Sequence, residues 1–121
     1  MKEGGSIMTM TYYGAEKVVD NYNLMGPVKA ALEALVRYLA KELGESGIRV
    51  NALSPGPVMT RAASGLGHFD QLIEKSAKRS PLHNLVSIEQ IGETAAFLAS
   101  PKARHITGQT IFIDNGYNAL G

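Results

Sequence analysis

The chain has 121 residues, of which 45% are hydrophobic and 19% charged, and its formal net charge is +1. This composition is ordinary for one globular domain or a piece of one; it excludes global disorder and gives no support for a nucleic-acid or anionic-membrane partner. The absence of cysteine excludes disulfides, thiolate metal sites and a thiol nucleophile, and it fits a reducing cytosol.

No targeting or membrane signal is visible in the sequence. No apolar stretch approaches the roughly 18 residues that a membrane-spanning helix needs. The first residues, from Met1 to Ser6, lack the apolar core of a signal peptide. We therefore expect a cytoplasmic protein.

Strand-like and helix-like patterns alternate from the start of the chain. Residues 6–12 are short, apolar and β-compatible, which predicts a buried strand. Residues 13–21 form a polar loop. Residues 23–43 have apolar side chains at steps of three and four, which predicts a helix that ends at Gly44.

The apolar residues of this helix form one stripe, while Glu33 and Arg37 lie off it. The stripe consists of Leu24, Val28, Leu32, Leu35, Leu39 and Leu43. Such a face is compatible with packing against a core or against a second copy of the helix.

The second half of the chain repeats the alternation. Residues 48–54 predict a strand that is stopped by the prolines at 55 and 57. Residues 69–79 predict a short helix. Ser87 and Gln90 form a plausible capping box that opens a helix through Ala99. Residues 109–114 predict a last strand.

Strands that alternate with helices predict crossover units and a parallel sheet. Three strands make a small parallel sheet, and the first of them begins almost at the amino terminus. We therefore expect an α/β fold that is one half of a Rossmann-like doubly wound sheet. It would have about three strands with flanking helices, in a single partial domain over residues 1–121.

Tyr22 and Lys29 are the first candidates for chemistry. Seven residues are close to two helical turns, which would place both side chains on one face, about 10.5 Å apart along the axis. A lysine leans back toward the helix amino terminus, and its charge would favour a phenolate and make the hydroxyl a better proton donor. Such a group can stabilise an oxygen anion that forms during a reaction. The alternative is a packed tyrosine and a surface lysine that happen to have this spacing.

Three groups of residues carry a resemblance to a known family. Residues 12–16 (Tyr-Tyr-Gly-Ala-Glu), 21–26 (Asn-Tyr-Asn-Leu-Met-Gly) and 29–30 (Lys-Ala) resemble the catalytic segment of bacterial enoyl-[acyl carrier protein] reductases, in the short-chain dehydrogenase/reductase superfamily. Most of this superfamily places three residues between the tyrosine and the lysine. Here position 26 is glycine, and the six intervening residues are the spacing of the enoyl reductases.

The resemblance extends over essentially the whole chain. Further segments that resemble the family are 49–57 (a strand and its loop), 60–65 (the entry to a lid) and 108–117 (the last strand). The amino-terminal half that the family carries, with its glycine-rich pyrophosphate loop, has no counterpart in this sequence. The chain therefore resembles the carboxyl-terminal half of the family fold.

The resemblance implies a reaction and its catalytic residues. Tyr22 would donate a hydrogen bond to the thioester carbonyl of a trans-2-enoyl-[acyl carrier protein], while NADH delivers hydride to the β-carbon. Lys29 would bind the ribose hydroxyls of the cofactor. Tyr12 would be the second active-site tyrosine and line the acyl pocket; its alternative is an aromatic residue packed at a strand end.

The resemblance also implies binding residues. Gly56, Val58 and Thr60 would contact the nicotinamide and phosphates, although a proline-glycine turn alone would explain the glycine. Lid residues over the acyl chain would be Ala62, Ala63, Leu66 and Phe69, for which a surface flap is the alternative. His68, His83 and His105 share no metal-ligand spacing, so no metal site is expected.

The implied function is the reductive step of fatty-acid elongation, in a homotetramer that the helix of residues 23–43 helps to build. Two alternatives stay open. One is a related reductase of coenzyme A thioesters. The other is a non-catalytic remnant that only associates with full-length subunits, which the missing glycine-rich loop favours.

Overall fold

The computed structural model describes residues 4–58 and 69–120, with side chains from residue 74 onward in the second range. The elements in chain order are β1 (Gly5–Met10), α1 (Met25–Leu43), β2 (Ile48–Pro55), α2 (Phe69–Arg79), α3 (Ile88–Ala99) and β3 (Thr110–Ile113). A 3-10 turn over Tyr13–Ala15 follows β1. Every predicted strand and helix is present, with bounds within two residues of those expected. None of the helices in these two ranges is long and apolar enough to cross a membrane.

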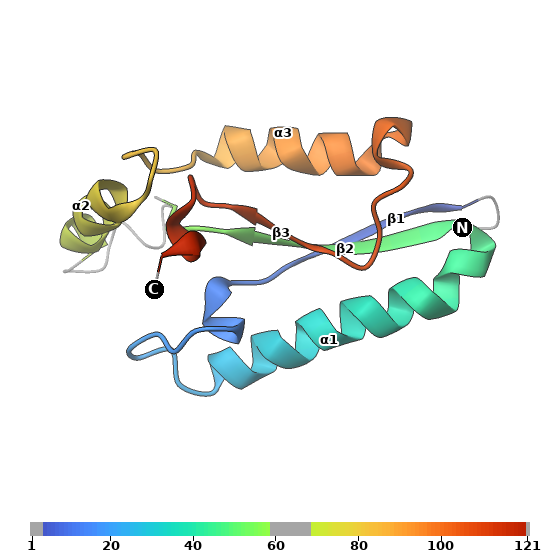
Figure 1. The fold of residues 1–121 in the computed structure, drawn as a ribbon, viewed down its shortest axis with the longest axis horizontal. Coiled ribbons are helices and arrows are strands. Elements are labelled where there is room, and N and C mark those ends of the chain that lie inside the picture. Colours follow the sequence, from blue (N-terminus) through green and yellow to red (C-terminus); the bar gives the residue numbers. More distant parts are fainter. Residues whose placement is uncertain (1–3, 59–68, 121) are drawn as a thin grey trace.

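The three strands form one parallel sheet in the order β1-β2-β3. Helix α1 covers one face of the sheet and α3 the other, while α2 lies near the carboxyl ends of the strands (Figure 1). The predicted α/β class with a three-stranded parallel sheet is therefore confirmed.

The central strand β2 is buried on both faces, as a parallel sheet with crossover helices requires. Val50 and Ala52 pack with Val36 and Ala40 of α1. The next residue, Leu53, points the other way and packs with Leu98 and Ala103 on the α3 side. Alternation along one strand thus builds two cores, one on each face.

A buried amide joins β2 to the segment that leads into β3. The Asn51 side chain donates to the Ile106 carbonyl at 3.0 Å and accepts from the Gln109 amide at 3.1 Å. The amide of Gly108 donates to the Val50 carbonyl at 2.7 Å. Because Asn51 is completely buried, these bonds satisfy polar atoms that would otherwise be costly there.

Helix α1 departs from the predicted single apolar stripe. The side chains that it buries are Glu33, Val36 and Ala40, while Leu39 and Leu43 pack at the edge of the same core. Three other predicted stripe residues are exposed, Leu24 by 79%, Val28 by 53% and Leu35 by 50%, while Leu32 is half-buried. The helix therefore has two apolar faces, and periodicity alone did not reveal which one meets the sheet.

The predicted capping box of α3 is confirmed. The Ser87 hydroxyl accepts from the Gln90 amide at 3.1 Å, and the Gln90 side chain accepts from the Ser87 amide at 2.9 Å. Both bonds satisfy amides that the first helical turn leaves without partners.

Replacing this cap gives a direct stability test. Ser87→Ala is expected to lower the free energy of unfolding by about 1 kcal/mol, because one amide loses its acceptor. Urea unfolding of the two proteins measures the difference. The exposed Ser46, in the 3-10 turn after α1, supplies the control: Ser46→Ala is expected to change stability by less than about 0.5 kcal/mol. Equal effects of the two substitutions would contradict the assignment.

Candidate active site

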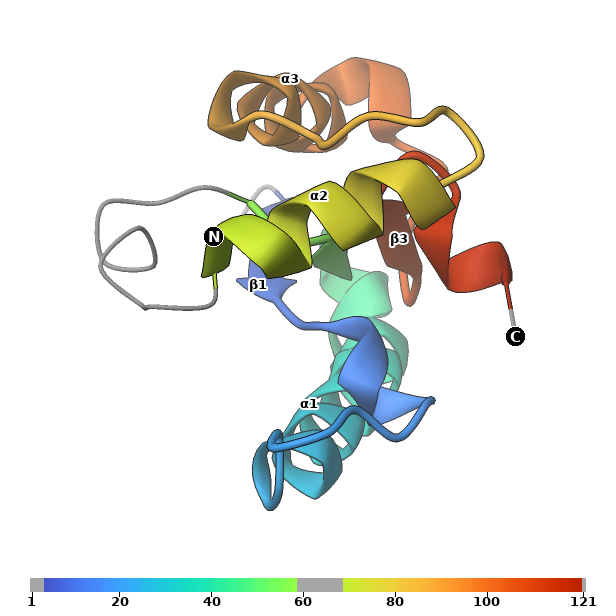
Figure 2. The ribbon, with the colours of Figure 1, turned by 90° about the vertical axis from the view of Figure 1, so that its left-hand side faces the viewer.

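The candidate site lies at the carboxyl ends of the three strands. Figure 2 looks onto this end of the sheet, where the turn after β1, helix α2 and the carboxyl-terminal turn come together. Parallel α/β sheets bind their ligands at this edge, because the loops that leave the strands gather there.

Tyr12 and Tyr22 meet at this edge. Their ring centroids are 5.2 Å apart with an interplanar angle of 64°, an edge-to-face contact. Tyr12 follows β1 directly, and the amide of the preceding Thr11 still donates to the Leu53 carbonyl of β2 at 2.8 Å. The sheet therefore fixes the position of Tyr12, and Tyr12 in turn contacts Tyr22.

Tyr22 lies in the turn before α1, not on the helix. Its neighbours Asn21 and Asn23 have φ values of 65° and 52°, the left-handed region that asparagine tolerates better than most residues. The Met25 amide, at the first residue of α1, donates to the Tyr22 carbonyl at 3.1 Å. The expected separation of two helical turns between Tyr22 and Lys29 is therefore wrong.

Lys29 lies one turn into α1 and reaches back to β1. Its ammonium donates to the Met10 carbonyl at 3.2 Å, at the last residue of the strand. The backward lean expected of a helical lysine is present, and it takes the charge to the strand end that precedes Tyr12. The structure thus gathers the three predicted catalytic residues Tyr12, Tyr22 and Lys29 at the end of β1.

Two glycines allow the turn of Tyr22 to pack closely. A Cβ atom on Gly14 would lie 2.6 Å from Cδ2 of Tyr22, and a Cβ atom on Gly26 would lie 3.1 Å from the Gly14 carbonyl oxygen. Side chains at these positions would have to displace the tyrosine ring or the turn. Sequence reasoning singled out Gly26 only because lysine was missing there, and it did not single out Gly14.

Further aromatic contacts link the site to the carboxyl-terminal turn. Tyr13 contacts Tyr12 with ring centroids 4.7 Å apart and Tyr117 with centroids 5.5 Å apart. The guanidinium of Arg79, the last residue of α2, lies 5.4 Å from the Tyr117 ring centroid. Lys17 donates to the carbonyls of Asn118 and Leu120, both at 2.5 Å. Sequence periodicity carries no signal for these contacts, because they join loop residues far apart in the chain.

Partial burial raises the pKa of two tyrosines of the site. It raises the pKa of the Tyr12 phenol far above its usual value, with a smaller contribution from the neighbouring Tyr13. It also raises the pKa of Tyr22. The expected lowering of the Tyr22 pKa by Lys29 is therefore wrong, since removal from water is the cause that acts on this phenol.

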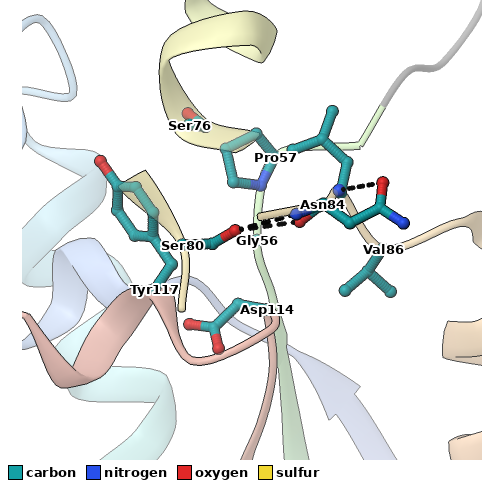
Figure 3. A pocket seen from close by; sticks show the side chains of 9 residues that line it. Gly56, Pro57, Ser76, Ser80, Asn84, Val86, Asp114 and Tyr117 are labelled. Carbon is teal, nitrogen blue, oxygen red and sulfur yellow. Dashed lines mark hydrogen bonds between the residues drawn. The ribbon is translucent and has the colours of Figure 1, made fainter. Parts of the chain in front are cut away.

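Gly56 and Val58 follow β2 at the same edge. The Gly56 amide donates to the Ile113 carbonyl at 3.1 Å, and a Cβ atom on Gly56 would lie 2.9 Å from the Asp114 Cβ. Figure 3 shows Gly56 and Pro57 beside Ser80 and Asp114, around a small recess. The contact with Asp114 by itself accounts for glycine at position 56.

The structure does not describe the side chains of the remaining predicted binding residues. Thr60, Ala62, Ala63 and Leu66 lie outside the described residues. Phe69 is the first residue of α2, and its side chain is also outside what the structure describes. Their predicted roles stay predictions.

Comparison with known proteins identifies the family of this chain. The profile of the family described as Enoyl-(Acyl carrier protein) reductase matches residues 1–118. The chain belongs to this family. It is 51% identical over 121 residues to the NADH-type enoyl-[acyl carrier protein] reductase of Bacillus cereus and 52% identical to reductase 1 of Rhizobium meliloti. Both matches include 100% of this chain, but they span only 47% and 44% of the length of those two proteins.

Solved structures of enoyl reductases have the same fold as this chain. The crystal structure of the Bacillus cereus reductase with NADP+ and an indole naphthyridinone superposes on the chain with a TM-score of 0.94 at 51% identity. The reductase of Anaplasma phagocytophilum in complex with NAD superposes with a TM-score of 0.91 at 45% identity. The chain covers 47% and 44% of those two chains, so the predicted match to half of the reductase fold agrees with both comparisons.

The close packing of the Tyr22 ring on Gly14 predicts that a side chain at position 14 destabilises the fold. Gly14→Ala is expected to displace the Tyr22 ring and to lower the free energy of unfolding by about 1–3 kcal/mol, the range for overpacking. Urea unfolding and the tyrosine ring signals in NMR measure both effects. Gly92→Ala is the matched control: nothing lies within 4 Å of its added Cβ, and this helical position should gain up to about 1 kcal/mol. An unmoved Tyr22 signal in Gly14→Ala would contradict the close contact.

The partly buried phenol of Tyr12 predicts a loss of stability in alkali. Because folding raises the pKa of Tyr12, its contribution to stability is complete below the unfolded pKa of about 10 and is lost as the pH rises above that value. Urea unfolding at a series of alkaline pH values measures this loss. Tyr12→Phe removes the titrating group, so its stability should fall less steeply with pH. Parallel curves for the two proteins would show that Tyr12 does not ionise at higher pH in the folded chain.

Proposed function

We propose that this chain provides the catalytic half of an NADH-dependent enoyl-[acyl carrier protein] reductase, which reduces the trans-2 double bond of the acyl thioester in fatty-acid elongation. One observation supports this most strongly. Tyr12, Tyr22 and Lys29 gather at the carboxyl end of β1. The whole chain is also 51% identical in sequence to an NADH-type enoyl-[acyl carrier protein] reductase.

Tyr22 has the properties that a hydrogen-bond donor to the thioester carbonyl needs. A tyrosine hydroxyl carries its proton at neutral pH and can donate a hydrogen bond, and partial burial moves the pKa of Tyr22 further upward, away from ionisation. When hydride adds to the β-carbon, the electron pair of the double bond moves toward the carbonyl oxygen as an enolate. A fixed donor stabilises that charge as it forms. A proton added at the α-carbon then completes the reduction.

The residues present fit a nicotinamide nucleotide. Lys29 places an ammonium, which has only donors to offer, at the edge where α/β sheets bind nucleotides. In the proposal Lys29 holds the ribose hydroxyls, and Gly56, Val58 and Thr60 contact the nicotinamide and phosphates. When bound, NADH supplies the hydride. The choice of NADH over NADPH follows the printed names of the curated relatives.

Tyr12 forms part of the acyl site in this proposal. It lies edge-on to Tyr22 and between Tyr22 and Tyr13, so an apolar acyl chain next to the reacting carbonyl would meet aromatic surface. Ala62, Ala63, Leu66 and Phe69 form the lid over that chain. The protein acts in the cytoplasm, on acyl groups carried by the acyl carrier protein.

A second candidate function is association without catalysis. The outer face of α1 exposes Leu24, Val28, Leu35 and Tyr38, at steps of four, seven and three residues. A second copy of the chain, or a longer subunit of the family, would cover this apolar face in a homo-oligomer. The chain spans about half the length of the curated relatives it matches, so activity and association need separate tests.

The decisive experiment is oxidation of NADH by the purified chain with a trans-2-enoyl thioester. Tyr22→Phe is expected to lower kcat by about 100-fold or more, because it removes the donor to the developing charge. Tyr38→Phe is the matched control: Tyr38 is 72% exposed on the outer face of α1, and kcat should not change.

Each outcome separates the two candidate functions. Activity that falls only in Tyr22→Phe supports the proposed reaction. Activity that is equal in both variants would place the reaction elsewhere, and no activity would favour association without catalysis.

A further inference from the structure

Glu33 is a carboxylate buried between α1 and the sheet. It is only 6% exposed and occupies the face of α1 on which Val36 and Ala40 pack against β2. Burying a carboxylate is costly unless hydrogen bonds replace its water, and an apolar side chain would fill such a position more cheaply. The stripe of leucines in the sequence placed Glu33 on the polar side of the helix, so its burial is a product of the tertiary structure.

Two hydroxyls from the two outer strands meet this carboxylate. The Thr11 hydroxyl donates to Oε2 at 2.6 Å, and the Thr110 hydroxyl lies 3.4 Å from Oε1. Thr11 follows β1, and Thr110 begins β3 opposite Ala52 of the central strand. One side chain of α1 thus links the residue after β1 to the first residue of β3.

Glu33 also lies one helical turn after Lys29, on the same side of α1. Lys29 donates to the Met10 carbonyl, while Glu33 accepts from the next residue, Thr11. Consecutive turns of the helix therefore hold consecutive residues at the end of β1. The residue that follows them is Tyr12, whose ring contacts Tyr22.

We propose that Glu33 is a positioning residue for the active site. Through Thr11 it locks the register between α1 and the end of β1, and so determines where Lys29 and Tyr12 stand relative to Tyr22. A hydrogen bond to a carboxylate is directional and strong, whereas an apolar contact would let the helix slide along the strand. The effect of this register on catalysis rests on the proposed function, but the register itself does not.

The test uses the whole chain with carbon-13 in its tyrosine rings. In Glu33→Ala and in Thr11→Val, the ring signals of Tyr12 and Tyr22 should shift, while that of Tyr38, exposed on the far face of α1, should stay in place. The Thr11 amide, which donates to the Leu53 carbonyl, should exchange with solvent about tenfold faster or more in both variants. Thr11→Val keeps shape and volume, so this arm holds even where Glu33→Ala unfolds.

Two controls separate positioning from general stability. Glu33→Gln keeps an acceptor at the same reach and should retain the native ring shifts and amide protection. Glu42→Ala removes an exposed carboxylate from the same helix and should change neither. Unchanged Tyr12 and Tyr22 signals in Thr11→Val would overturn the proposal, as would a uniform rise of exchange throughout the chain. Because these measurements need no turnover, an inactive chain would count against the proposed function without touching this inference.

Discussion

The structure depends on the burial of β2 from both sides. A parallel strand between two others must be covered on each face, so its residues alternate between the α1 core and the α3 core. Asn51, fully buried, ties the same strand to the segment before β3. With β2 held in this way, β1 and β3 pair beside it in parallel and all three strands end at one edge. The candidate site exists because of that common edge.

Close packing at this edge gives a physical reason for the long spacing between tyrosine and lysine. Position 26 is where most of the superfamily carries its lysine. Here a side chain at Gly26 would press on the Gly14 carbonyl, and one at Gly14 would strike the Tyr22 ring. A lysine at 26 would therefore have to shift the Gly14 turn on which the Tyr22 ring packs. Lys29, three residues further along α1, reaches the Met10 carbonyl of β1.

The proposed chemistry relies on burial more than on charge. Both tyrosines carry their protons at neutral pH, and partial burial raises the pKa of each further, so they can act as hydrogen-bond donors and as an aromatic wall. The Lys29 ammonium donates one hydrogen bond to the Met10 carbonyl. Because an ammonium has three donors, it can also donate to hydroxyl groups of a ligand at the same edge. The chain covers about half of its relatives, and the cradle for a pyrophosphate is expected in the part of the family fold that it does not cover.

The sequence alone determined the order of elements, the parallel α/β class, the capping box of α3 and the family, because these follow from local periodicity and from short motifs. It also singled out Tyr12, Tyr22 and Lys29. Only the tertiary structure decided which face of α1 meets the sheet, since the helix carries two apolar faces and buries Glu33 against the sheet. It also decided that the ring of Tyr22 packs on Gly14. Contacts between loops far apart in the chain leave no periodic trace, because they are set by how the strand ends meet in space.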